Sequence, residues 1–460
     1  MSVLIKNGRV VTASDDFLAD VFIQNEKITK VAENISLATT TVIDAANKLV
    51  IPGGIDVHTH IDMPYGDIKS TDDFETGTIA AAFGGTTTII DFAVQSKGQS
   101  LFDALNIWKQ KADGKAVIDY GFHIIITDAN EKYLSELDKV VNEGVTSFKL
   151  FTAYPGRLML NDSDIFRVMQ QAKQNGALIM MHAENGYVID KLIQQTLAEG
   201  KTEPIYHALT RPSALEGEAT NRTIALAKVA DVPVYIVHVT CNEAIDAIKQ
   251  ARMQGQKVFG ETCPHYLLLS EDDLRRPNFE GAKYVLSPPL REKKHQQTLW
   301  DSLNDNVLQT IATDHCPFNF RQHKELGRYD FTKIPNGAPG IENRLHLSYE
   351  FGVNQKRFSL NRWVELVSTN PAKIFGMYPQ KGEIAAGCDA DIVIWNPNTA
   401  HTISAQTHHM RVDYNMFEGF KVTGNAETVI ARGEVIVEKN KFLSKPGRGK
   451  FIKRNLFIKK

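Results

Sequence analysis

The 460-residue sequence predicts an α/β fold, in which a TIM-like parallel (β/α)₈ barrel is joined to a second, smaller β-sandwich domain built from both termini. Apolar runs recur about every thirty residues through the middle of the chain, with helical stretches between them, and this alternation is typical of a parallel barrel. Both ends carry short strands separated by turns instead. The length agrees, because 460 residues are too many for one small domain but suit a barrel with an accessory domain.

The two ends of the chain contain the strands of the expected sandwich. Asn7-Gly8 predicts a turn between the first two strands, and Arg432-Gly433 predicts one between the last two. The expected strands are 3–5, 9–12, 20–24, 27–31 and 41–44 at the N-terminal end, and 390–395, 428–431 and 434–438 at the C-terminal end. Because two β-rich ends flank a different middle, we expect one discontinuous sandwich that both termini complete.

Eight apolar runs in the middle of the chain are the expected barrel strands: 49–55, 86–92, 121–127, 147–151, 177–181, 232–239, 257–261 and 309–312. Helical stretches such as 74–83, 101–111 and 165–174 separate them, and each run is apolar on both faces, as in buried parallel strands. A doubly wound open sheet is the alternative, but no Gly-x-Gly-x-x-Gly turn follows a first strand. The expected divisions are sandwich over 1–51 and 374–440, barrel over 52–373, and a basic arm over 441–460.

Composition argues against several classes of function. The chain carries 52 Lys and Arg against 54 Asp and Glu, and the net charge of −2 argues against a nucleic-acid binder. Its four cysteines are widely spread and form no Cys-x-x-Cys pair, which favours a reducing, cytoplasmic compartment. Lys6 interrupts the N-terminus before a signal peptide could develop, and no apolar run is long enough to cross a membrane. We therefore expect a soluble, cytoplasmic protein.

Groups able to bind metal or move protons follow most of the apolar runs. His58 and His60 close the first run, and residues two apart on a strand share one face, so both imidazoles can point at one ion. The fourth, fifth, sixth and eighth runs end in Lys149, His182, His238 and Asp314. Each of these precedes a loop, which places it at the C-terminal mouth of a barrel, where such enzymes keep their active sites. A single histidine is more often a packed core residue, but six donors at matching positions predict a metal site.

Lys149 needs its own explanation, because an ammonium repels cations and by default forms a salt bridge. Its amine can instead react with carbon dioxide to give a carbamate, which is an anionic bridge between two metals, and burial favours the neutral amine that this reaction requires. Nitrogen and oxygen ligands suit Zn²⁺, although Mn²⁺, Co²⁺ and Fe²⁺ also fit. Asp314 is placed to take a proton from the attacking hydroxide and return it to the leaving nitrogen, or to serve as a ligand or helix cap.

Longer stretches around these residues resemble the cyclic amidohydrolases, and most closely the hydantoinase and dihydropyrimidinase family. The matching stretches are 52–60, 82–88, 147–154, 312–317 and 339–342, and 382–394 resembles the family's closing sandwich motif. The likeness covers nearly the whole chain, and the full set is highly specific, whereas the His-x-His pair alone would be weak.

The resemblance implies a site with two divalent metal ions, with zinc as the first choice. The implied ligands are His58, His60 and Asp314 for one ion, His182 and His238 for the other, and carboxylated Lys149 as the bridge. Tyr154 matches the tyrosine that donates a hydrogen bond to the developing oxyanion, and otherwise is a loop aromatic. Ser287 and Asn336 match positions whose main-chain groups hold the cyclic amide, and by themselves are ordinary turn residues. The family also implies a homotetramer or a homodimer.

The implied reaction begins with attack of a metal hydroxide on a ring carbonyl. Tyr154 and the metal stabilise the oxyanion, and Asp314 protonates the leaving nitrogen. Dihydropyrimidines would give N-carbamoyl β-amino acids, and 5-substituted hydantoins would give N-carbamoyl α-amino acids. The small cyclic amide is the expected partner, with no nucleic acid and no membrane.

The segment after the second histidine separates this chain from neighbouring families. Dihydroorotases and allantoinases, which are the alternative, generally place an arginine there, whereas this chain has 61–65 without one. We expect Asp62 to repel an anionic substrate. Four residues either form an apolar wall for a 5-substituent or only pack the loops: Met63, Tyr65, Phe151 and Leu158.

Two other classes of function compete with the enzyme. A cytoskeletal scaffold is one, because animal relatives with this fold lack the metal ligands, but all six ligand positions are filled here. The basic tail 439–460 could contact nucleic acid or an anionic membrane. It also resembles the family's C-terminal arm, and we expect it to pack against a neighbouring subunit.

Overall fold

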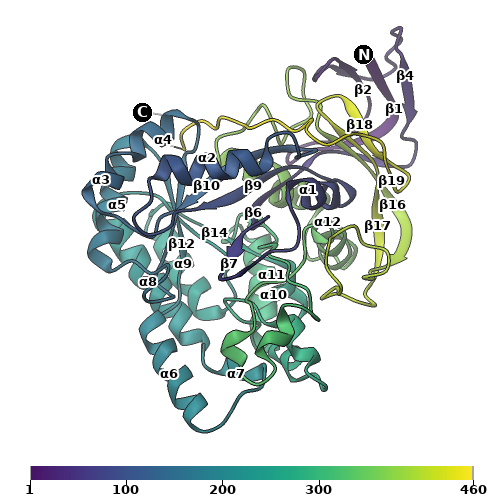
Figure 1. The fold of residues 1–460 in the computed structure, drawn as a ribbon. Coiled ribbons are helices and arrows are strands. Elements are labelled where there is room, and N and C mark those ends of the chain that lie inside the picture. The colour runs from purple at the N-terminus through teal and green to yellow at the C-terminus, as the bar shows by residue number, and fades with distance from the viewer. Residues whose placement is uncertain (1, 458–460) are drawn as a thin grey trace.

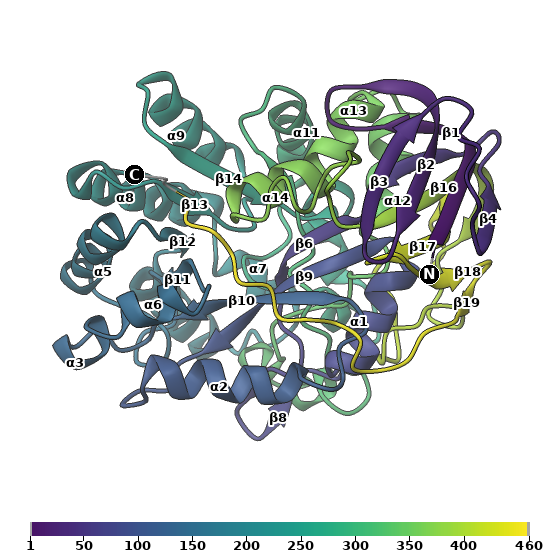
Figure 2. The same ribbon diagram turned by 90° about the horizontal axis from the view of Figure 1, so that it is seen from above.

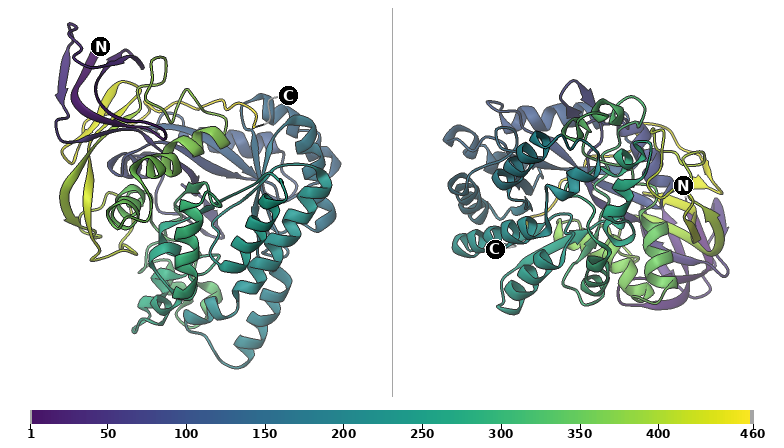
Figure 3. Two further views of the ribbon diagram at one scale, coloured as in Figure 1. Left: turned by 180° about the vertical axis from the view of Figure 1, so that it is seen from behind. Right: turned by 90° about the horizontal axis from the view of Figure 1, so that it is seen from below.

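The computed structural model describes residues 2–457 as two units, a parallel barrel surrounded by helices and a separate, mostly antiparallel sheet on one side of it (Figure 1). The views from behind and from below show the same arrangement (Figure 3). These two units confirm the predicted fold class. Within the described residues, every helix is too short or too polar to cross a membrane.

Eight parallel strands form the barrel, in the order β15-β14-β13-β12-β11-β10-β9-β6. Their bounds are β6 (Gly54–Thr59), β9 (Thr86–Val94), β10 (Asp119–Ile125), β11 (Ser147–Phe151), β12 (Leu178–His182), β13 (Val234–Ile236), β14 (Val258–Thr262) and β15 (Thr310–Ile311). A parallel bridge between Thr59 and His315 brings the two end strands together, so the barrel is nearly closed. Alternate residues of a strand belong to different apolar clusters, as Ile89 and Ile90 of β9 show, which explains why each strand is apolar on both faces.

Helices lie between the barrel strands and surround them. The α-helices are α1 (Phe74–Phe83), α2 (Leu101–Ala112), α3 (Glu131–Leu134), α4 (Leu137–Asn142), α5 (Asp162–Asn175), α6 (Gly186–Ala198), α7 (Ile205–Leu209), α8 (Ser213–Ala230), α9 (Asn242–Met253), α10 (Pro264–Leu268), α11 (Gln296–Asn304), α12 (Arg344–Ser348), α13 (Leu360–Val364) and α14 (Asn370–Ile374). Short 3₁₀ segments are η1 (Glu271–Arg275), η2 (Glu280–Tyr284), η3 (Lys293–His295), η4 (Lys324–Gly327) and η5 (Phe331–Lys333), and π-helical segments are η6 (Tyr349–Asn354) and η7 (Glu365–Thr369).

Helix α1 shows how local sequence sets an element. The carboxylate of Asp73 accepts hydrogen bonds from the main-chain N–H groups of Glu75 and Thr76, and the Thr76 hydroxyl accepts one from the N–H of Asp73. This capping box satisfies donors that the first turn leaves free. The helix buries small residues around Ala81, which lets it lie close against β9. Both α1 and α2 lie where the sequence predicts helices.

The apolar run 49–55 is divided between the two units, although the sequence predicts one barrel strand there. β5 (Leu49–Pro52) pairs with β1 and β16 of the second sheet, and β6 begins the barrel at Gly54. The break falls at Gly53, whose N–H donates to Asp391 of the sheet, while the N–H of Gly54 donates to Gly85 of the barrel. A side chain at position 53 would overlap Thr87, so the close approach of the two units requires glycine.

Both ends of the chain build the second sheet, as predicted, with its strands in the order β19-β18-β17-β16-β5-β1-β2-β3 and with β4 beside β1. Its other strands are β1 (Ser2–Val11), β2 (Asp16–Gln24), β3 (Lys27–Ala32), β4 (Thr41–Asp44), β16 (Ile392–Thr402), β17 (Lys421–Ala431), β18 (Glu434–Glu438) and β19 (Lys441–Phe442), and a separate hairpin joins β7 (Pro64–Tyr65) to β8 (Ile68–Lys69). Asn7-Gly8 is not the predicted turn. Asn7 has a positive φ and donates its N–H to Asp20, so β1 continues through a bulge.

A buried ion cluster joins the barrel to the second sheet. The ammonium of Lys381 lies 2.9 Å from Asp119 at the start of β10, 3.2 Å from Asp389 and 2.5 Å from Asp391. Arg432, in the turn between β17 and β18, pairs with Asp119 at 2.8 Å. Three acidic side chains close enough to hold a metal are therefore already neutralised by two basic ones.

The C-terminal arm crosses the N-terminal end of the barrel of its own chain (Figure 2). Phe451 forms a parallel bridge with Tyr120, and Arg454 donates to the carbonyl of Phe122 and, at 2.9 Å, to the hydroxyl of Ser147. Ile452 belongs to one apolar cluster with the inner barrel residues. The expected contact with a neighbouring subunit is thus replaced, up to residue 457, by contact within the chain. The last part of the predicted arm, 458–460, lies outside the described residues.

Candidate active site

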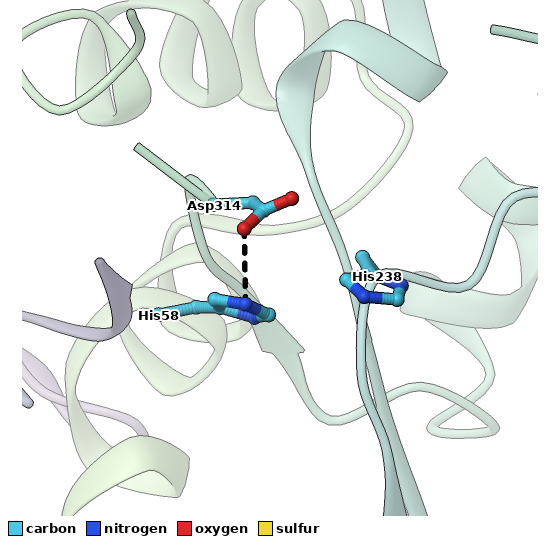
Figure 4. A group of neighbouring side chains, drawn as sticks. All are labelled: His58, His238 and Asp314. Carbon is cyan, nitrogen blue, oxygen red and sulfur yellow. Dashed lines mark ion pairs between the residues drawn. The ribbon is translucent and has the colours of Figure 1, made fainter. Parts of the chain in front are cut away.

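The six predicted metal donors lie together at the C-terminal end of the barrel. His58 belongs to β6 and His60 follows it, Lys149 lies in β11, His182 ends β12, and His238 and Asp314 follow β13 and β15. Figure 4 shows Asp314 and His58 facing each other with His238 beside them. Donor atoms of these three residues all lie within 4.8 Å of one another, a spacing that one metal ion could bridge.

The donors form two groups around the central lysine. In the first, Oδ1 of Asp314 lies 3.0 Å from Nε2 of His58 and 3.2 Å from Nε2 of His60. In the second, Nδ1 of His182 lies 2.9 Å from Nε2 of His238. The Nζ atom of Lys149 is 3.0 Å from Nε2 of His58. The structure therefore brings the six residues together in the same two sets that the family resemblance implies.

The donor set fits divalent metal ions of the zinc type. Imidazole nitrogens and carboxylate oxygens are the ligands that such ions prefer, and here the inward-facing nitrogens converge on two positions. Burial lowers the pKa of His60 to about 4, and it lowers the pKa of His238 well below the usual range. Both rings are therefore neutral near pH 7, which is the form that binds metal.

Two buried glutamates contact the outer nitrogens of these histidines. Glu261 in β14 contacts Nδ1 of His58, and its other oxygen accepts a hydrogen bond from the Tyr235 hydroxyl at 2.8 Å. Glu184 lies 2.7 Å from Nε2 of His182. Neither glutamate was predicted as a site residue. The signal was a carboxylate inside a buried strand, or two residues past a strand-end histidine, where burial requires a partner.

Burial and charge set the protonation of the central groups. Burial lowers the pKa of Lys149 to about 8. Burial alone would raise the pKa of Asp314, but His58 and His60 outweigh it and hold that pKa well below the usual range. Asp314 is thus a carboxylate at every pH at which the enzyme is folded, and Lys149 is far easier to deprotonate than an exposed lysine.

Three site residues have left-handed backbone conformations. The φ angles are 63° at Tyr154, 39° at His238 and 51° at Asp314. Residues with a Cβ atom adopt this region rarely, and such conformations gather at functional sites. The loops after β11, β13 and the eighth barrel strand therefore turn sharply, and this turn presents each side chain to the centre.

A pocket covers the metal-ligand group. Among the residues that line it are the predicted Tyr154, Ser287 and Asn336, and all four candidates for the apolar wall, namely Met63, Tyr65, Phe151 and Leu158. The amide nitrogen of Asn336 donates to the Ser287 hydroxyl at 3.1 Å, which joins the two loops. Burial raises the pKa of Tyr154, so its hydroxyl keeps its proton and can donate a hydrogen bond.

The charge near the pocket differs from the expectation. Asp62 does not line the pocket, because its carboxylate turns to Lys69, whose ammonium is 2.6 Å away. Arg157, which the sequence analysis did not single out, does line it, with the guanidinium 5.3 Å from the centre of the Tyr65 ring. The argument that Asp62 repels an anionic substrate is therefore wrong.

Comparison with known proteins agrees with this geometry. The model of the amidohydrolase family matches residues 49–436. The chain is 54% identical to a D-hydantoinase of Geobacillus stearothermophilus over 455 residues, which cover 99% of this chain and 97% of that protein. It is 52% identical to a D-hydantoinase of Streptomyces coelicolor, over 98% and 97% of the two chains. The crystal structure of a dihydropyrimidinase from Brevibacillus agri superposes with a TM-score of 0.99 at 53% identity and covers 100% of both chains.

Proposed function

The chain belongs to the amidohydrolase family and is a cyclic amidohydrolase of the hydantoinase and dihydropyrimidinase type; from this premise we propose how its residues open the ring. The proposed substrates are dihydropyrimidines and 5-substituted hydantoins, and the products are N-carbamoyl amino acids. One observation carries the proposal: six donors from separate strand ends face one centre under a pocket lined by Tyr154, Ser287 and Asn336.

In the proposal, the six donors hold two divalent metal ions, with Zn²⁺ as the first choice. When bound, these ions polarise the ring carbonyl and make water acidic enough to attack it near neutral pH. His58, His60 and Asp314 would hold one ion, and His182 and His238 the other. Lys149 would bridge both as a carbamate. A pKa of about 8 supports this modification, because about one tenth of the amine is then neutral at pH 7, the form that reacts with carbon dioxide.

The chain's own groups then move the protons. Asp314 accepts the proton of the attacking water and returns it to the leaving ring nitrogen, as its position beside both histidines supports. The Tyr154 hydroxyl donates a hydrogen bond to the oxygen that becomes negative in the transition state. Main-chain groups of Ser287 and Asn336 hold the ring by its amides.

A hydrolysis panel tests the substrate and the role of Asp314 together. It uses dihydrouracil, a 5-substituted hydantoin, allantoin and dihydroorotate with the wild type, Asp314→Ala and Asp62→Asn. We expect hydrolysis of the first two and a loss of at least about 10²–10⁴-fold in Asp314→Ala. Asp62→Asn should match the wild type, because Asp62 pairs with Lys69 outside the pocket. A preference for dihydroorotate would overturn the substrate, and full activity of Asp314→Ala would overturn the mechanism.

We further propose a homotetramer or homodimer in the cytoplasm. The four cysteines are free and buried, which agrees with a reducing compartment. Light scattering coupled to gel filtration gives the subunit number. The same measurement after deletion of 441–460 asks whether the arm, which lies on its own barrel as far as residue 457, also affects assembly.

A further inference from the structure

Lys324 lies behind the two loops that carry Ser287 and Asn336. Its ammonium donates three hydrogen bonds, all to main-chain carbonyls, at 2.7 Å to Val285, 2.6 Å to Pro335 and 2.7 Å to Gly337. The side chain is fully buried, and within residues 2–457 no acid pairs with it. An ammonium has three donors, so one residue uses its whole capacity to hold these two loops together.

Two further side chains hold the other carbonyls beside Ser287. Nε2 of His207 donates to the carbonyl of Leu286 at 2.8 Å, and the Tyr266 hydroxyl donates to that of Pro288 at 2.7 Å. Nδ1 of His207 accepts from Arg211 at 3.1 Å, which leaves the proton on Nε2. Burial lowers the pKa of His207 well below its usual range, so the ring keeps this neutral form.

The peptide groups between these held carbonyls remain free. Within residues 2–457, the main-chain N–H and C=O groups of Ser287 and Asn336 form no hydrogen bond, although both residues line the pocket. A cyclic ureide presents alternating N–H donors and C=O acceptors on its rim. Free main-chain acceptors and donors held in place are the complement of that rim.

We infer that Lys324, together with His207 and Tyr266, positions the main-chain groups of Ser287 and Asn336 that bind the cyclic amide. This inference rests on the proposed function. The three side chains are positioning residues, since none of them lines the pocket. Without the ammonium, three buried carbonyls lose their donors, and the two loops relax away from the geometry that fits the ring. The metal ligands, which lie on other elements, stay in place.

Lys324→Met tests the inference, because methionine has a similar length and no donor. The matched control is Arg454→Met, which also removes a buried cation that donates to a main-chain carbonyl, but at the opposite end of the barrel. KM and kcat for dihydrouracil, bound metal and Tm are measured for both variants and the wild type. We expect KM to rise about tenfold or more in Lys324→Met with a much smaller change in kcat, because the lost contacts bind substrate and transition state alike. Bound metal should not change.

Tyr266→Phe provides a milder second variant if Lys324→Met does not fold. It removes one hydroxyl and should raise KM several-fold, with kcat and bound metal close to the wild type. An unchanged KM in Tyr266→Phe and Lys324→Met, or an equal rise in Arg454→Met, would overturn the inference. Failure of the wild type to hydrolyse any ring in the panel would instead overturn the proposed function.

Discussion

At each predicted metal position, one histidine is held from behind by a buried carboxylate and the other is not. Glu261 holds His58 and Glu184 holds His182, whereas the outer Nδ1 atoms of His60 and His238 have no hydrogen-bond partner within residues 2–457. A carboxylate behind an imidazole fixes its orientation and makes its inner nitrogen a stronger donor. The two positions are thus built alike, although they use different strands.

Glu261→Gln should weaken metal binding. Glutamine keeps the size and one acceptor but loses the charge, and outer partners of this kind contribute about 10–100-fold in metal affinity. Metal retained after dialysis against a graded series of chelator concentrations measures this. Glu216→Gln is the control, because Glu216 is equally buried but pairs with Arg291 at 2.7 Å and touches no ligand. Equal metal retention in the two variants would contradict the expectation.

The sequence reveals metal donors more readily than the residues that hold them. His58, His182 and Asp314 can be found because each follows an apolar run, and strand ends of a parallel barrel meet in one place. Glu261 and Lys324 give no such signal, since a residue that holds a distant partner has no spacing rule. The contact between His58 and Glu261, for example, joins residues 203 positions apart.

Among the elements, the junction of β5 and β6 shows where periodicity alone fails. Both strands are buried and apolar, so the run 49–55 reads as one strand, and the change of partner depends on Gly53. The bulge at Asn7 has the same character, because an Asn-Gly pair allows a positive φ in a turn and in a bulge alike. Helices α1 and α2 were predictable because their caps are local.

Gly53→Ala should destabilise the protein. Its Cβ would lie 2.1 Å from the Thr87 hydroxyl oxygen and 2.8 Å from the Thr87 Cβ, so one strand has to shift. The expected cost is about 1–3 kcal/mol, and chemical denaturation measures it. Gly121→Ala in β10 is the control, because the nearest atom to the added Cβ is 3.5 Å away. A Gly53→Ala variant as stable as Gly121→Ala would show that the junction tolerates a side chain.

On the scale of the whole molecule, the ion cluster around Lys381 connects the barrel, the second sheet and, through the N–H of Lys450, which donates to Asp119 at 3.0 Å, the C-terminal arm. Three carboxylates share two basic partners in a site that water does not reach. Such a cluster stabilises the docking of the units only while its charges are balanced.

Lys381→Met should therefore cost about 3–5 kcal/mol of unfolding free energy, because it leaves buried carboxylates without a cation. Lys27→Met is the control, since Lys27 pairs with the same Asp389 at 2.7 Å but is half exposed, and its loss should cost at most about 1 kcal/mol. Denaturant titration of both variants measures the difference. Equal losses would mean that burial adds nothing to this pairing.

The second sheet also sets a timetable for the growing polypeptide. β5 leaves the ribosome early, but its partner β16 is made more than three hundred residues later. At about 5–20 residues per second, the edge of β5 waits for tens of seconds without its pair. Exposed edges invite pairing with other chains, so nascent copies on one messenger are most vulnerable to aggregation in this interval. Slow translation should lengthen that exposure, and chaperones that bind the N-terminal strands should shorten it.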